Sequence, residues 1–588
     1  MPPTSHNSAR SRVYRNGVAV IVVALVATSL LYWLGWPSLG QVAKAFPLVL
    51  VLAVVVQLLS VKLTRGENTL GRIARSDWAI LVIALFGFGV AASLCLFGTV
   101  PQPRAHDEFS YLLAADTFAH GRLTNPTHPM WVHFETIHVL QQPSYASKYP
   151  PGQGIMLAIG ELLGKPVIGV WISTALACAA LFWMLSQWMP AGWALAGGIL
   201  SALHPQMLEW AHTSWGGQVA VIGGALAVGA FKRVMDGPRF RDGLLAGIGL
   251  SIMANSRPFE GLILTIVLGV ALLFHFRARP RSELRPVIKK FVPAAAAVLL
   301  LTAVAMGIYN RRVTGSVFTM PYMVYEAAYD PAPLFLWQAP RTVPAYNHFE
   351  IQDMFAGDFA YSYLKAQSLS GFLAVTKNRL LWYATWYFLA WPIFACLLVV
   401  IVWACWRDGS MRLVAWILGA FAVLLLGETF IYAHYVAPAA GLCLLLALMA
   451  FRHLRTWRPR HLRIGVLATR VLAILLLLLF GNVYRIALQV NTSDWFYQRA
   501  NLMQQLTDHG GRHLILVHYV PGYDPPIEWV YNAADIDNSP VVWAHDMGNT
   551  KNQELLEYFK DRQVWLLTLV RRSASFAPYV PGHDQPAP

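Results

Sequence analysis

The stretch "WAILVIALFGFGVAASLCLFGT", residues 78–99, contains no charged side chain and consists mainly of Ala, Leu, Ile, Val and Phe. A helix of about 20 apolar residues is long enough to cross the ~30 Å hydrocarbon core of a bilayer. The stretch therefore predicts a membrane-spanning helix, and the fold class depends on how often such a stretch recurs.

Similar apolar runs recur along the whole chain of 588 residues, whose mean hydropathy is +0.47 and of which only 13% are charged. A soluble protein of this length would need more polar surface. We therefore expect an all-α polytopic membrane protein with about 13 transmembrane helices. The expected spans lie at 17–36, 45–61, 78–99, 167–188, 191–205, 216–231, 243–255, 259–276, 291–309, 381–405, 413–432, 435–451 and 471–487.

The placement of basic residues predicts the orientation of these spans. With the N-terminus inside, the cytoplasmic connections contain 25 of the 45 Lys and Arg residues and only six acidic residues. This is the bias of cytoplasmic loops toward positive charge. The net charge of +15 is thus explained by orientation in the lipid bilayer and by contact with anionic head groups, and no nucleic-acid partner is expected.

The chain divides into four regions by composition. Residues 1–99 hold the N-terminal transmembrane helices, and 100–166 form a first large external loop. Residues 167–487 form the transmembrane core, which includes an external loop at 310–380. Residues 488–588 alternate helical segments with strand-like runs such as "HLILVHY", which predicts a small extramembrane α/β domain.

An acid pair, Asp107 and Glu108, stands in "RAHDEFSYLLAADTFAHGR" (104–122), where the span at 78–99 leaves the membrane on the external side. A structural interpretation is that Asp107 caps a helix and Glu108 favours its dipole. A functional interpretation is that a carboxylate takes the proton of a sugar hydroxyl as a new C–O bond forms. The two carboxylates are the candidate catalytic residues.

Further polar residues fall on the same external face, in the segments "YASKYPPGQG" (145–154), "NSRPFEG" (255–261) and "YAHYVAP" (432–438). Cations there would stabilise the charge of a departing lipid phosphate, and Arg matches phosphate oxygens bidentately. A simple Arg–Glu ion pair and an interfacial histidine are the structural alternatives. The candidate substrate-binding residues are Lys148, Tyr149, Arg257, Glu260, His434 and Tyr435.

The acid pair in the first external loop, the "YPPG" before the next span and the late "HYVAP" turn together resemble the GT-C glycosyltransferases. The similarity is to the bacterial branch that includes lipid A aminoarabinose transferases and protein O-mannosyltransferases. It implies a GT-C-like helical bundle in the bacterial inner (cytoplasmic) membrane, with the active site facing the periplasm. It also implies an inverting transfer from a polyprenyl-phosphate sugar donor to a cell-envelope glycan, lipid or protein acceptor.

By this resemblance Asp107 is the likelier base of the acid pair, and His434, Tyr435 and Pro438 match the late motif. Arg257 resembles a phosphate contact. The adjacent Asp-Glu pair, without the spacer of an Asp-x-Asp, resembles the metal-independent branch, so no cofactor is expected.

Two observations bear on metals and disulfides. All five cysteines lie in apolar runs, which favours core packing over a disulfide or a thiolate metal site. In the C-terminal region, Asp535, Asp537 and Asp546 could bind a divalent metal but more often such acids cap turns.

Other functions stay open at this point. A transporter or flippase for lipid-linked sugars would place polar groups near the middle of the bilayer, within paired repeats. A polymerase or ligase would use a diphosphate-linked oligosaccharide. The concentration of polar residues at one face favours the transferase.

Overall fold

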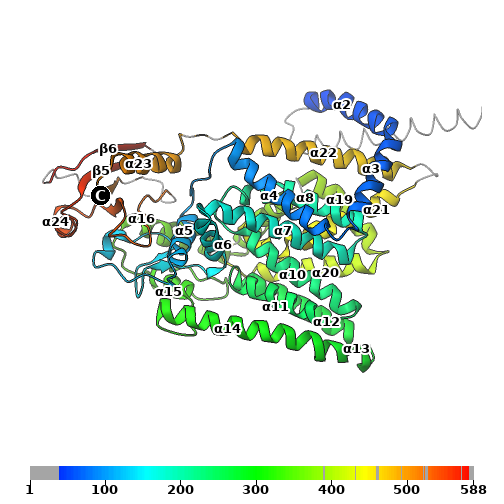
Figure 1. The fold of residues 1–588 in the computed structure, drawn as a ribbon, viewed down its shortest axis with the longest axis horizontal. Coiled ribbons are helices and arrows are strands. Elements are labelled where there is room, and N and C mark those ends of the chain that lie inside the picture. Colours follow the sequence, from blue (N-terminus) through cyan, green and yellow to red (C-terminus); the bar gives the residue numbers. More distant parts are fainter. Residues whose placement is uncertain are drawn as a thin grey trace, which may run out of the picture.

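The computed structural model describes residues 39–581, except for residues 278, 388–390, 431, 459–462, 490, 492, 521, 523–526 and 571–572. The predicted span at 17–36 and the last residues, 582–588, lie outside the described residues. The described part is a long bundle of helices with a small sheet domain at one end (Figure 1).

The bundle is built from helices that match the predicted apolar runs. They are α2 (Leu39–Leu58), α3 (Ser60–Ile73), α4 (Ala79–Phe97), α7 (Pro166–Trp188), α8 (Ala191–Leu203), α9 (Pro205–Trp210), α10 (Gly217–Asp236), α11 (Phe240–Ala254), α12 (Pro258–Phe276), α13 (Arg281–Pro286), η2 (Val287–Phe291), α14 (Val292–Thr314), α18 (Leu369–Tyr387), α19 (Trp391–Cys405), α20 (Gly409–Leu425), η4 (Ala433–Ala439), α21 (Ala440–Thr456) and α22 (Ile464–Ala487).

The expected number of thirteen spans is not confirmed. Among the described residues, seven helices are long and apolar enough to cross a membrane, or up to nine if each bent pair counts as one span. Two of the predicted spans form shorter helices: α8 has 13 residues and α11 has 15. The chain is a multi-pass membrane protein whose predicted runs include helices too short to span a bilayer alone.

Helix α10 lies at the centre of the bundle, where it packs against α7, α11, α12, α21 and η4. By contrast, α14 runs along one edge (Figure 1) and leaves most of its apolar surface exposed. In a membrane protein such surface faces lipid, which is as apolar as the side chains themselves.

Polar contacts between predicted loops lie at the two ends of the bundle. At one end, Glu67 of α3 forms ion pairs with Arg455 and Arg470, so the predicted cytoplasmic segments 62–77 and 452–470 meet. At the opposite end, Arg104 pairs with Glu209 at 3.4 Å. There His212 also contacts the carbonyl of Thr99 at 2.9 Å, so two predicted external loops meet.

The segments predicted to be external form short elements between the bundle and the sheet domain. They are α5 (His106–Ala119), η1 (Trp131–Phe134), β1 (Val139–Leu140), β2 (Ala146–Ser147), α6 (Pro151–Leu162), α15 (Pro321–Tyr329), α16 (Phe349–Gln352), η3 (Asp353–Phe359) and α17 (Ala360–Gln367). Proline lies in the first turn of α6, α7, α12 and α15. Its fixed φ suits a helix start, where the missing N–H has no intrahelical partner anyway.

The C-terminal region folds as the predicted α/β domain. Its elements are α23 (Trp495–His509), β3 (His513–Tyr519), β4 (Val541–His545), α24 (Asn549–Tyr558), β5 (Gln563–Val570) and β6 (Ser573–Pro578). The sheet order is β4-β3-β5-β6, in which β3 pairs parallel with β4 and β5, and β6 is antiparallel.

One face of this sheet rests on the helix that carries the acid pair. Phe109 and Leu113 of α5 share a buried cluster with Leu514 and Leu516 of β3. The ring of Phe109 also stacks on Tyr531 with centroids 4.1 Å apart. The sheet domain therefore contacts one side of α5, while α6 packs against α5 from the bundle side.

Close packing of α10 against η4 gives a stability prediction. A Cβ at Gly224 would lie 1.8 Å from the carbonyl oxygen of Pro438, so Gly224→Ala must displace the backbone of η4. We expect a loss of about 1–3 kcal/mol, seen as a lower Tm of the purified protein in detergent. Gly269→Ala in α12 is the control, because its Cβ meets nothing within 4 Å. Equal Tm values for the two variants would contradict this packing.

Candidate functional site

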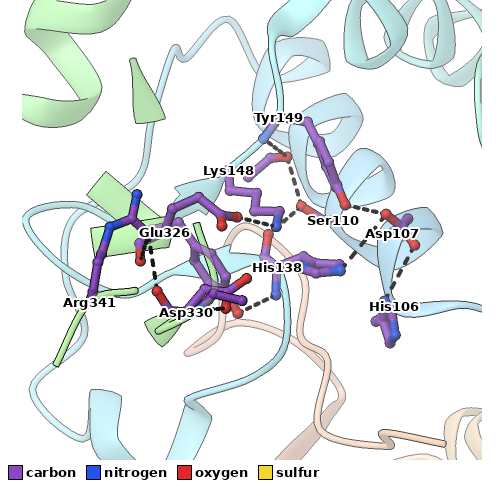
Figure 2. A network of polar contacts seen from close by, with 12 residues as sticks. His106, Asp107, Ser110, His138, Lys148, Tyr149, Glu326, Asp330 and Arg341 are labelled. Carbon is purple, nitrogen blue, oxygen red and sulfur yellow. Dashed lines mark hydrogen bonds and ion pairs between the residues drawn. The ribbon is translucent and has the colours of Figure 1, made fainter. Parts of the chain in front are cut away.

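Asp107 lies in the first turn of α5, but it does not cap the helix. The N-cap is Ala105, which has no side-chain capping bond. The carboxylate of Asp107 instead accepts a hydrogen bond from the hydroxyl of Tyr149. It also lies 3.3 Å from Nδ1 of His106 and 3.9 Å from Nε2 of His138 (Figure 2). The capping interpretation is therefore wrong, because this carboxylate is aimed at side chains.

These neighbours determine the charge of Asp107. Burial by itself would raise the pKa of Asp107, but the imidazoles of His138 and His106 and the Tyr149 hydroxyl lower it well below its usual range. Burial and the charge of Lys148 hold the pKa of His138 well below its usual range. Asp107 is therefore a carboxylate at neutral pH.

A short hairpin and a tyrosine position His138. Strands β1 and β2 pair Val139 with Ser147, which brings His138 beside Lys148. The backbone N–H of His138 donates to the hydroxyl of Tyr325 at 2.8 Å, and Ser110 of α5 donates to its carbonyl at 2.6 Å. His138 has a φ of 66°, which a non-glycine residue rarely adopts, so these bonds hold a strained backbone.

Glu108 points away from this cluster. Its Oε2 accepts the backbone N–H of Ser214 at 2.7 Å, and its Oε1 accepts that of Arg104 at 3.2 Å. Burial raises the pKa of Glu108 to about 7, while these backbone bonds and the charge of Arg104 oppose the rise. The two adjacent acids are thus in different environments, and Glu108 ties α5 to the loop before α10.

A buried charge network lies beside His138. Lys148 Nζ contacts Glu326 Oε1 at 3.0 Å, and both side chains are 3% exposed. Burial and the charge of Glu326 raise the pKa of Asp330 to about 8, so Asp330 is mostly protonated at neutral pH. The guanidinium of Arg341 donates to the backbone carbonyls of Glu326 and Asp330 (Figure 2). This network anchors α15 to the hairpin.

The predicted binding residues of the later segments form the other side of the site. The guanidinium of Arg257 lies 4.6 Å from the ring centre of Tyr435 and 4.0 Å from Glu260. His434 interacts electrostatically with both Arg257 and Asp107. The structure therefore brings Asp107, Tyr149, Arg257, Tyr435 and His434 together, although they come from four separate segments.

Several residues of this region carried no local sequence signal. His138, Glu326 and Asp330 surround the predicted residues only because loops fold back on α5, whereas His106 is the first residue of α5 itself. Arg379 of α18 is another, since it donates to the backbone carbonyls of Glu428 and Thr429. Arg379 also lines a cleft of about 200 Å³ with Val375, Asn378, Trp382 and Tyr383. An arginine at the outer end of an apolar run was the signal that could have found it.

Three groups of side chains in the described residues have the spacing of metal ligands, namely His106–Asp107–His138, His348–Glu350–His545 and Asp116–His120–Glu161. The first contains the candidate base, the second is buried and the third is partly exposed. The acids suggested from the sequence do not converge in this part of the chain. Asp535 bonds Asn538, Asp537 contacts His128 and Asp546 contacts His518.

No family model and no curated protein matches the chain. Among solved structures it is similar to ArnT from Cupriavidus metallidurans in the apo state, with 11% identity, 82% of this chain and 92% of that chain covered, and a TM-score of 0.47. For the same protein bound to undecaprenyl phosphate the identity is 12% and the TM-score is 0.48, with 84% of this chain and 93% of that chain covered.

The chain is also similar to the oligosaccharyltransferase of Archaeoglobus fulgidus in complex with Zn and sulfate, with 13% identity and a TM-score of 0.46. The similarity covers 83% of this chain and 67% of that one. Both neighbours are GT-C membrane glycosyltransferases, the class that the sequence motifs resemble. At these identities and TM-scores the likeness concerns the path of the chain alone.

The Lys148–Glu326 pair gives a prediction at this site. Lys148→Met leaves a buried carboxylate without its cation, which costs about 3–5 kcal/mol in other proteins. We expect a clear drop in the Tm of the purified protein. The double variant Lys148→Met/Glu326→Leu should recover much of the loss, because no charge stays unpaired. A double variant less stable than the single one would contradict a direct pairing.

Proposed function

We propose that the chain is a GT-C-type glycosyltransferase. It moves a sugar from a polyprenyl-phosphate donor to an acceptor hydroxyl or amine of a cell-envelope glycan, lipid or protein, with inversion at the sugar carbon. The proposal places it in the inner membrane of a bacterium, with the site on the periplasmic side. The single observation that carries it is the ionised, half-buried carboxylate of Asp107, which lies between the bundle and the sheet domain and is held by Tyr149.

Asp107 has the properties of a general base in this reaction. As the acceptor oxygen attacks the anomeric carbon, its proton passes to the Asp107 carboxylate, and the bond from that carbon to the phosphate oxygen breaks. Tyr149 and His106 fix the orientation of the carboxylate through their contacts with it. Attack from the face opposite the phosphate inverts the sugar carbon.

The leaving phosphate needs positive charge more than it needs an acid. Arg257 is 14% exposed, and its guanidinium is held by Glu260 and the ring of Tyr435. Arg379 lines the cleft on α18 beside Glu428, next to aromatic side chains of the kind found at membrane interfaces. Arg257, which like Asp107 interacts with His434, is one candidate phosphate contact, and Arg379 is the candidate at the lipid edge.

Two single substitutions distinguish the role of Asp107 from that of Glu108. Asp107→Asn should lower turnover by about 10²–10⁴-fold, because the amide cannot accept the proton. Glu108→Gln should lose far less, because Glu108 accepts backbone N–H groups and faces away from the site. The measurement is mass spectrometry of cell-envelope glycans and glycolipids from cells that express each variant or none.

The control for this test is His212→Gln, because His212 only contacts the Thr99 carbonyl. Each variant's level in the membrane is compared by immunoblot, and its Tm is measured after purification. A product profile of Asp107→Asn that equals the wild-type profile would refute the assignment of the base.

The orientation of the chain is tested separately. In a cysteine-free background, Lys560→Cys in the sheet domain and Arg281→Cys at the opposite end introduce single exposed thiols. A membrane-impermeant maleimide should label position 560 in intact spheroplasts and position 281 only after lysis. The reverse pattern would place Asp107 on the cytoplasmic side and end the proposal.

A further inference from the structure

A second polar cluster lies at the seam between the sheet domain and the loops beneath it. His545 ends β4, whereas His348 and Glu350 lie at the start of α16, which borders the sheet domain in Figure 1. Glu135 follows η1 and belongs to the first external loop. The reaction proposed above uses none of these residues.

The cluster has the geometry of a metal site. Ligand atoms of His348, Glu350 and His545 lie within 4.8 Å of one another. Nδ1 of His545 is 3.0 Å from Oε1 of Glu350. The two imidazole rings stack with centroids 3.9 Å apart, so one ring must turn before both nitrogens can point at a single ion. In a tetrahedral site with metal–ligand bonds of about 2.0–2.1 Å, neighbouring ligand atoms are roughly 3.3 Å apart.

The outer nitrogens of both imidazoles are already held. Nε2 of His348 lies 2.7 Å from the carbonyl of Val132, and Nε2 of His545 lies 2.7 Å from the carbonyl of Glu135. A carbonyl only accepts, so each Nε2 carries a hydrogen and Nδ1 is the nitrogen available as a ligand. Histidines that bind metals are fixed in this way, because the donated N–H sets the tautomer and the ring orientation.

The charge balance of the cluster also points to a cation. Glu135, Glu350 and Glu528 are all buried, and among the described residues no Lys or Arg forms an ion pair with any of them. Arg499 donates instead to the carbonyls of Trp529 and Tyr531, and Lys551 lies at the surface.

The carboxylates accept hydrogen bonds from neutral donors. Tyr329 and Asn347 donate to Glu135, and Tyr519 and the N–H of Val530 donate to Glu528. A buried carboxylate without a cation is costly, and an ion bound by His348, Glu350 and His545 would lower that cost.

We propose that His348, Glu350 and His545 bind a zinc ion that fastens the C-terminal domain to the external loops. Two imidazoles and a carboxylate suit Zn²⁺, and a water or a neighbouring carboxylate completes a tetrahedral set. Binding at Nδ1 of His545 releases to solvent the proton that this nitrogen otherwise shares with Glu350.

Without the ion the same residues form a different bond. Burial alone would lower the pKa of His545, but the charges of Glu528 and Glu350 and the bond to Glu350 raise it to about 9. His133, whose Nδ1 contacts the carbonyl of His545, and Lys551 also face this region. A metal-free protein therefore holds an imidazolium–carboxylate pair here, which is the alternative that the experiment must separate.

The test uses the purified full-length protein in detergent at pH 7.5. After dialysis against metal-free buffer containing no chelator, inductively coupled plasma mass spectrometry should find about one zinc per chain. EDTA should lower the Tm, and added ZnCl₂ should restore it, because a ligand that binds only the folded state stabilises that state. A wild-type protein that holds no zinc, and whose Tm responds to neither reagent, overturns the proposal.

Variants assign the ion to this cluster. Glu350→Gln and His348→Gln should lose the zinc and the response of Tm to EDTA. His120→Gln and His138→Gln should keep both, because they alter the two other groups with ligand spacing. Loss of zinc from either control, with retention in Glu350→Gln, would overturn the assignment. The wild-type measurement stands even if a variant fails to fold.

Discussion

The seating of α5 between the bundle and the sheet domain is the constraint on which the rest of the site depends. Phe109 and Leu113 are buried against β3, and the opposite side of α5 packs on α6. This sandwich shields the start of the helix, where Asp107 lies half-buried. A carboxylate in that position stays charged because the fold supplies partners: Tyr149 donates a hydrogen bond to it, and the imidazole of His106 lies 3.3 Å away.

Other charged groups near Asp107 also depend on partners supplied by the fold. Lys148, beside His138, pairs with Glu326, and burial and the charge of Glu326 raise the pKa of Asp330. His138 and Lys148 belong to the first loop, and Glu326 and Asp330 belong to α15 and its C-terminal end, so loss of either segment would leave a buried charge uncompensated. Charge compensation therefore stabilises the contacts among these loops as much as apolar packing does. The cluster around His545 does the same where the sheet domain meets the loops.

The sequence predicted what depends on local composition. The run at 78–99 became α4, and the strand-like run "HLILVHY" became β3. The number of spans was harder to predict, because a run of apolar residues does not reveal whether its helix reaches both faces of the membrane. The capping role considered for Asp107 failed because the helix starts earlier, after Ala105.

By itself the sequence determined the class of protein, the two polar ends of the bundle and which residues were candidates for chemistry. Hydropathy and charge act over a few neighbouring residues, so they can be read along the chain. The tertiary structure alone decided that Asp107 and Glu108 have different surroundings. It also decided that His138 contacts Asp107, that Lys148 pairs with Glu326, and that His434 interacts with both Arg257 and Asp107. Such contacts join residues far apart in sequence, because the packing of α5, the hairpin and α15 sets which side chains meet.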